Sequence, residues 1–107
     1  RYIGLMQAEE QAEIVRRLRS AGGHLEAIIG MLEAGEPCEP ILHQLGAVQA
    51  ALRAAGARLL ACQLRQSQDV IRHSPCAEDR AAEITRLLVL YNLLTRFFDY
   101  SERDRHD

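Results

Sequence analysis

Residues 14–48 read IVRRLRSAGGHLEAIIGMLEAGEPCEPILHQLGAV and carry the strongest structural pattern in the 107-residue chain. Apolar side chains recur in steps of four and three from Ile14 to Leu32, which aligns them in one stripe along a helix. The segment GEPCEP at 35–40 interrupts the pattern, because proline lacks an amide donor and fits only the first turn of a helix. A second stripe with the same spacing begins at Ile41. The stretch therefore predicts two long antiparallel helices joined by a short turn.

The rest of the chain extends this pattern into an all-α fold. The second stripe continues to about Ile71, and the turn HSPC at 73–76 precedes a third apolar segment. We expect one domain over residues 1–107, with helices at about 5–34, 39–72 and 76–100 and a frayed polar tail after residue 100. The apolar face of the third segment is wider than one hairpin can cover, so we expect it to be buried between subunits of a helical bundle.

The glycines of the first helix also suggest close packing. Gly22, Gly23 and Gly30 each cost roughly 0.5 to 1 kcal/mol relative to alanine in a helix, so they indicate a close approach of helices rather than local stability.

Composition limits the classes of protein that fit. The formal net charge is -2, and all 13 basic residues are arginine. No apolar run of about 18 residues could span a membrane, and no signal peptide is recognisable, so a cytoplasmic protein is expected. No nucleophile–base pair or phosphate-binding loop indicates an enzyme.

Arginines gather in two places along the sequence. Arg16, Arg17 and Arg19 cluster in the first helix, and further arginines recur every seven residues on the second at Arg58, Arg65 and Arg72. Such side chains suit bidentate contacts with phosphates. The alternative is an ordinary solvated face on which arginines pair with Glu9, Glu10 and Glu13.

A family resemblance favours the first interpretation. The sequence RLRSAGGHLEAIIGMLE at 17–33, followed by Cys38 and by ILHQLGAVQAAL at 41–52, resembles the CsoR/RcnR family of metal- and thiol-sensing repressors. The likeness covers about Glu13 to Ser67. It implies a three-helix protomer, an antiparallel dimer, a dimer-of-dimers tetramer, and operator DNA as a partner. Arg17 matches a family DNA-contact position, whereas Ala54 stands where the family often has arginine, next to Arg53.

The resemblance also implies a sensing site, and this chain departs from it. In the copper-sensing branch a Cys early in the second helix, matched by Cys38, is joined across the dimer by a His-x-x-x-Cys pair. Gln63 and Ser67 stand at those two positions, and Glu83 matches a carboxylate beside the site. An amide and a hydroxyl are poor ligands for copper, nickel or zinc, so we expect no standard Cu(I) site and leave the cofactor open, with none as one possibility.

The cysteines keep several sensing chemistries open. Cys38 lies at the start of a helix, where amide groups favour a reactive thiolate, and formaldehyde or persulfide could be sensed there instead of a metal. Cys62 falls on the apolar stripe and is either a buried structural residue or a shifted sulfur ligand. Cys76, in the turn, could act as a resolving thiol for Cys38. The chain has three cysteines, which do not form a disulfide framework.

We therefore expect a homo-oligomeric DNA-binding repressor that senses a ligand at Cys38. The DNA face is expected to contain Arg16, Arg17, Arg19, Arg53, Arg58 and Arg65. The alternative is a structural helical oligomer of the same fold that has lost DNA binding or metal sensing.

Overall fold

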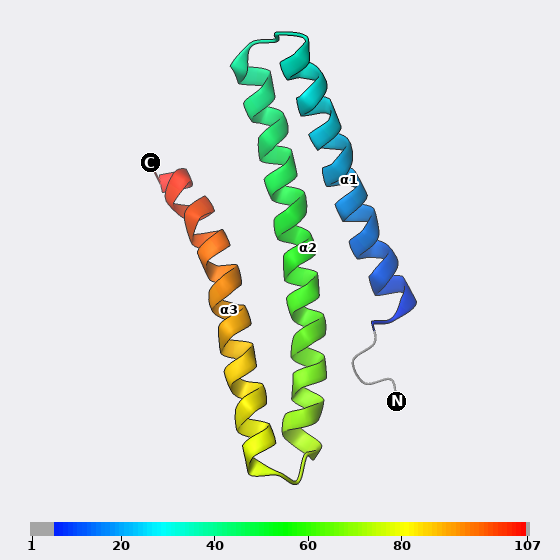
Figure 1. Cartoon of the computed structure of the whole chain (residues 1–107), viewed down its shortest axis with the longest axis vertical. Helices are drawn as coiled ribbons and strands as arrows, with labels where there is room; N and C mark the ends of the chain where they lie inside the picture. The colour runs from blue at the N-terminus through cyan, green and yellow to red at the C-terminus, as the bar shows by residue number, and fades with distance from the viewer. Residues whose placement is uncertain (1–5, 107) are drawn as a thin grey trace. The chain divides into compact units, whose positions relative to one another are not determined.

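The computed structural model describes the backbone of residues 6–106 and the side chains of residues 6–96. The described chain consists of three α-helices without a strand: α1 (Ala8–Glu33), α2 (Cys38–His73) and α3 (Ala77–His106) (Figure 1). The predicted all-α, three-helix class is confirmed. The chain consists of two compact units, and the boundary between them falls within α2. We call Met6–Arg58 the amino-terminal unit and the residues from Leu59 onward the carboxy-terminal unit.

The third helix is longer than predicted. It continues to His106, so the expectation of a frayed tail after residue 100 was wrong for the backbone. The sequence SERDRH at 101–106 contains neither glycine nor proline, so no local signal ends the helix there. The expected start of the first helix at residue 5 lies outside the described residues.

In the amino-terminal unit, α1 and the first part of α2 form an antiparallel hairpin whose core has a seven-residue period. Ile14, Ala21 and Ile28 of α1 are buried, as are Val48 and Ala55 of α2. The intervening members of the same two stripes are 39 to 61% exposed, namely Leu18, Leu25, Leu32, Leu45 and Leu52. Each predicted stripe is thus half packed within the hairpin, and its other half faces outward.

The turn between α1 and α2 is closed by a glycine in a left-handed conformation. Gly35 has a φ of 71°, which costs roughly 1 to 2 kcal/mol for a residue with a Cβ. Its amide donates to Leu32 O at 3.1 Å, and the amide of Glu36 donates to Met31 O at 3.0 Å. This pair of bonds is the Schellman arrangement that satisfies the last carbonyls of a helix. The helix-breaking role of the segment at 35–40 therefore rests on glycine as well as on proline.

The other glycines of α1 do not mark a close approach within the chain. A Cβ built on Gly22, Gly23 or Gly30 would meet nothing within 4 Å. The expectation that they allow helices to approach closely was therefore wrong for contacts inside the described chain.

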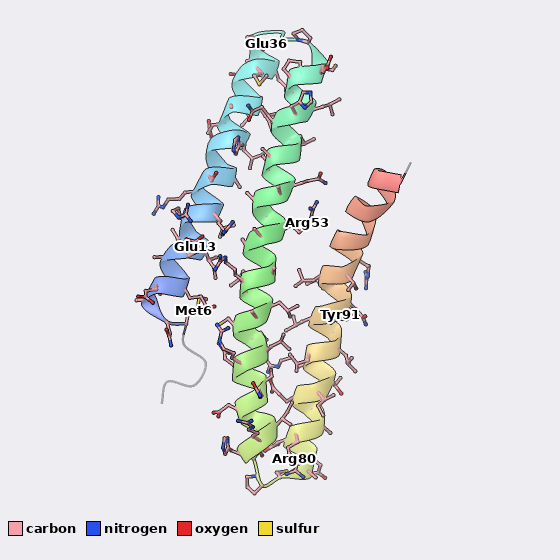
Figure 2. The ribbon with its side chains drawn as sticks, turned by 180° about the vertical axis from the view of Figure 1, so that it is seen from behind. Met6, Glu13, Glu36, Arg53, Arg80 and Tyr91 are labelled. Atoms are coloured by element: carbon pink, nitrogen blue, oxygen red, sulfur yellow. The ribbon has the colours of Figure 1, made fainter. Side chains whose placement is uncertain are left out.

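In the carboxy-terminal unit, a short turn joins α2 to α3. Ser74 Oγ accepts a hydrogen bond from the amide of Cys76 at 3.3 Å, and Arg80 Nη1 donates to Ser74 O at 2.7 Å. The apolar face of α3 is largely open: the exposed residues include Ile84, Leu88, Val89, Leu93 and Tyr91, which Figure 2 labels. Among the described helices, none combines the length and apolarity that a membrane crossing requires.

Candidate nucleic-acid interface and sensing residues

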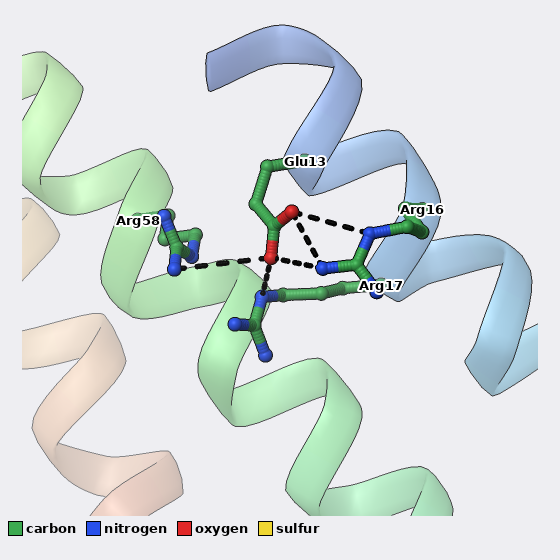
Figure 3. A network of polar contacts seen from close by, with 4 residues as sticks. All are labelled: Glu13, Arg16, Arg17 and Arg58. Atoms are coloured by element: carbon green, nitrogen blue, oxygen red, sulfur yellow. Dashed lines mark hydrogen bonds and ion pairs between the residues drawn. The ribbon is translucent and has the colours of Figure 1, made fainter. Parts of the chain in front are cut away.

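The carboxylate of Glu13, near the amino-terminal end of α1, lies close to three guanidinium groups. Arg16 Nη2 donates to both Glu13 oxygens at 2.6 Å, and Arg16 Nε donates to Oε1 at 3.2 Å (Figure 3). Arg17 Nε lies 3.0 Å from Glu13 Oε2, and Arg58 Nη2 lies 3.8 Å from the same oxygen. We call Glu13, Arg16, Arg17 and Arg58 the arginine cluster.

Helix geometry explains why these side chains meet. Arg16 and Arg17 follow Glu13 by three and four residues, which places all three on one face of α1. Arg58 comes from α2, which runs alongside α1 in the same unit (Figure 3). The sequence motif Glu-x-x-Arg-Arg could have revealed the pairing on α1, but nothing in the local spacing indicates that α2 supplies the third arginine.

The arginine cluster is positive and partly open to solvent. Three guanidinium groups and one carboxylate leave a net charge of +2, although the whole chain carries -2. The side chain of Arg16 is 71% exposed, that of Arg58 44%, and that of Glu13 25%. The hydrogen bond from Arg16 lowers the pKa of Glu13 below its usual value, and the same bond raises the pKa of Arg16. Glu13 is therefore ionised at neutral pH.

The remaining arginines predicted for the DNA face lie outside this cluster. Arg19 is exposed on α1, and Arg53 is partly buried on α2, where Figure 2 labels it. Arg65 is exposed but belongs to the carboxy-terminal unit. The structure therefore brings together three of the six predicted arginines and joins them to Glu13, which the sequence suggested only as a partner on an ordinary charged face.

Three of the residues predicted for sensing form a hydrogen-bonded chain. Gln63 Nε2 donates to Ser67 Oγ at 3.0 Å, and Ser67 Oγ donates to Glu83 Oε2 at 2.5 Å. Ser67 is completely buried, and the side chain of Glu83 is 15% exposed. The chain joins α2 to α3 within the carboxy-terminal unit, so the register predicted from the sequence places these three residues in one site.

The donors of this site do not fit a soft transition metal. Its amide and hydroxyl groups bond to each other and to a carboxylate, and such neutral oxygen and nitrogen groups are poor ligands for copper, nickel or zinc. Across the part of the chain that the structure describes, no group of three or more His, Cys, Asp or Glu side chains could hold a metal ion.

The three cysteines differ in their surroundings. Cys38 is the first residue of α2 and is exposed, in the amino-terminal unit. Cys62 is buried, and its sulfur accepts a hydrogen bond from Gln66 Nε2 at 3.3 Å. Cys76 is of intermediate exposure. Of the three, Cys38 is the most exposed in the single chain.

Comparison with known proteins assigns the chain to a family. The sequence profile described as a metal-sensitive transcriptional repressor matches residues 10–91, about three quarters of the chain. The chain belongs to this family. The resemblance predicted from residues 13–67 is confirmed, and the profile extends it through the first half of α3. The family is one of transcription regulators rather than enzymes.

One relative from this family of metal-sensitive repressors has been curated as a copper sensor. The copper-sensing transcriptional repressor CsoR of Mycobacterium ulcerans (strain Agy99) is 38% identical over 52 residues, which is 49% of this chain and 44% of the relative. The chain thus aligns with less than half of that relative's length. No solved structure matches the chain.

Proposed function

We propose that this chain is a DNA-binding transcriptional repressor of the CsoR/RcnR type. The observation that carries the proposal is the arginine cluster, in which two helices present three guanidinium groups with a net charge of +2 on a protein of net charge -2. Concentrated positive charge on one face suits a DNA backbone even when the net charge of the protein is negative. Among the described helices none is a separate recognition helix, so DNA recognition would depend on phosphate contacts and DNA shape.

In this proposal the functional protein is a homo-oligomer. Half of each apolar stripe on α1 and α2, and a broad face of α3, are exposed in the single chain. Exposed apolar area on this scale is typical of surfaces that another subunit covers. A dimer or tetramer of the family type would bury it.

Sensing in this proposal occurs at Cys38 and takes place between chains. The family resemblance supports this arrangement, because in the copper-sensing branch the Cys matched by Cys38 is joined across the dimer by the residues matched by Gln63 and Ser67. Ligand binding or covalent modification at Cys38 would favour a helix arrangement with lower DNA affinity. Allosteric coupling of this kind is typically worth about 1 to 3 kcal/mol.

A reporter experiment tests this function. The DNA upstream of the gene for this chain is placed before a reporter in a heterologous host, and the chain is expressed with and without formaldehyde, a persulfide donor or copper. We expect repression that one of these agents relieves by about fivefold or more, in keeping with ordinary coupling energies. The Cys38→Ser variant should repress equally well and no longer respond.

The cysteine variants separate the possible results of that experiment. Cys76→Ser separates two chemistries: a response like that of the wild type shows that Cys38 acts alone, and a lost response shows that Cys76 is its resolving thiol. Relief of repression that persists in Cys38→Ser would refute sensing at this residue. A complete lack of repression by the wild type would refute the repressor itself.

A second candidate function is a structural helical oligomer without DNA binding. It is favoured by one observation, namely that Glu13 already pairs with all three arginines of the cluster, as on an ordinary charged protein surface. In that case reversing arginine charges would leave the behaviour of the protein unchanged.

A further inference from the structure

The position of Glu13 in the arginine cluster resembles that of a bound phosphate. Its two oxygens take the Nε and Nη2 donors of Arg16, with the shorter contacts at 2.6 Å. A guanidinium group binds a phosphate through the same paired donors, because both anions offer two oxygens at similar spacing. The donors of Arg16 best suited to a DNA phosphate are therefore already occupied within the protein.

The contacts of Glu13 reach beyond its own helix. Arg17 Nε at 3.0 Å and Arg58 Nη2 at 3.8 Å face the same oxygen, Oε2, from α1 and α2 (Figure 3). One carboxylate thus occupies the point on which three guanidinium groups converge. A phosphate that contacted this point would have to displace the carboxylate or accept its negative charge as a close neighbour.

We propose that the Glu13 carboxylate competes with DNA phosphates for a phosphate-binding site formed by Arg16, Arg17 and Arg58. By occupying this site, Glu13 weakens sequence-independent DNA binding. The inference rests on the proposed DNA-binding function and identifies Glu13 as a residue that sets the affinity for DNA. An internal carboxylate would disfavour DNA whose phosphates do not fit the cluster well enough to replace it.

Exposure and charge favour competition over a purely orienting role. The Glu13 side chain is 25% exposed and that of Arg16 is 71% exposed, so both can exchange partners with solvent and with DNA. Ion pairs at such exposed sites are weak, and their geometry is readily given up. Because the pKa of Glu13 is lowered, the carboxylate retains its charge at neutral pH and the competition operates there.

The test compares Glu13→Gln with a matched control. Glu9→Gln makes the same change of charge one turn earlier on α1, outside the arginine cluster. The binding of each protein to a mixed-sequence 30-base-pair duplex is measured by fluorescence anisotropy over a range of salt concentrations. Circular dichroism verifies that each variant is folded.

We expect Glu13→Gln to bind about tenfold more tightly than the wild type at moderate salt. Its plot of log affinity against log salt concentration should be steeper by about two units for a dimer, since each subunit gains one phosphate contact. Glu9→Gln should change affinity by about twofold or less. Glu13→Asp, which retains the charge on a shorter side chain, should fall between the wild type and Glu13→Gln.

The outcomes distinguish this inference from the proposed function. If the wild type binds and Glu13→Gln binds equally or more weakly, Glu13 orients the arginines and the competition is refuted. If Glu9→Gln gains as much as Glu13→Gln, the effect comes from net charge and the competition is also refuted. If neither the wild type nor Glu13→Gln binds the duplex at low salt, DNA binding itself is refuted, and the inference with it.

Discussion

Reversing the charge of Arg17 and Arg65 together should weaken binding to the DNA upstream of this gene by about 1000-fold. Each reversal removes one phosphate contact per subunit, and a dimer would lose four. At roughly 1 kcal/mol for each lost contact, the total is about 4 kcal/mol, which corresponds to about three orders of magnitude in Kd. Gel retardation at low salt measures the change, and circular dichroism verifies the fold.

Arg96→Glu is the control for this experiment. Arg96 is an exposed arginine of α3, outside the predicted DNA face, and its reversal carries half of the charge change. We expect its effect on affinity to stay below about tenfold, because it removes no predicted phosphate contact and acts only through the overall charge. If the double variant binds DNA as the wild type does, these arginines do not form a DNA face, and the structural oligomer becomes the better account.

Restoring the missing family ligands should create copper binding, which we do not expect of the wild type. Gln63→His together with Ser67→Cys replaces an amide and a hydroxyl by an imidazole and a thiol, which are good ligands for Cu(I). The change also removes the hydrogen bonds that join Gln63, Ser67 and Glu83. We expect the variant to retain about one Cu(I) per chain after desalting against a Cu(I) chelator, and the wild type to retain none.

Two further variants serve as controls for the copper-binding prediction. Gln63→His with Ser67→Ala lacks the thiol and should retain no copper. Adding Cys38→Ser to the copper-binding variant should abolish retention as well, because we propose that Cys38 of a second chain supplies the other thiol. Tight copper retention by the wild type would contradict our interpretation of Gln63 and Ser67, and retention by the triple variant would place the metal elsewhere.

Much of the fold could be predicted because apolar periodicity is a local signal. The stripe from Ile14 to Leu32 and its continuation after Ile41 predicted the hairpin of α1 and α2. Which half of each stripe is buried could not be predicted, because a strict alternation of steps of four and three makes both halves equally apolar. Only the packing of two particular helices distinguishes the buried Ala21 from the exposed Leu25.

The candidate site was predictable to a lesser degree. The family register placed Gln63, Ser67 and Glu83 together, and the structure joins them by hydrogen bonds. The position of Glu13 among three arginines was missed, because a carboxylate beside two arginines is usually a surface ion pair, and the third partner, Arg58, lies 45 residues away in the sequence.

The salt dependence of DNA binding by the unmodified protein tests the central claim most directly. Retardation of the upstream DNA is followed between about 50 and 200 mM salt. A face of arginines that makes six to ten phosphate contacts predicts a loss of about 10³ to 10⁵ in affinity over this range. No retardation at about 50 mM salt, or an affinity that does not change with salt, would show that guanidinium groups on this protein do not engage a DNA backbone.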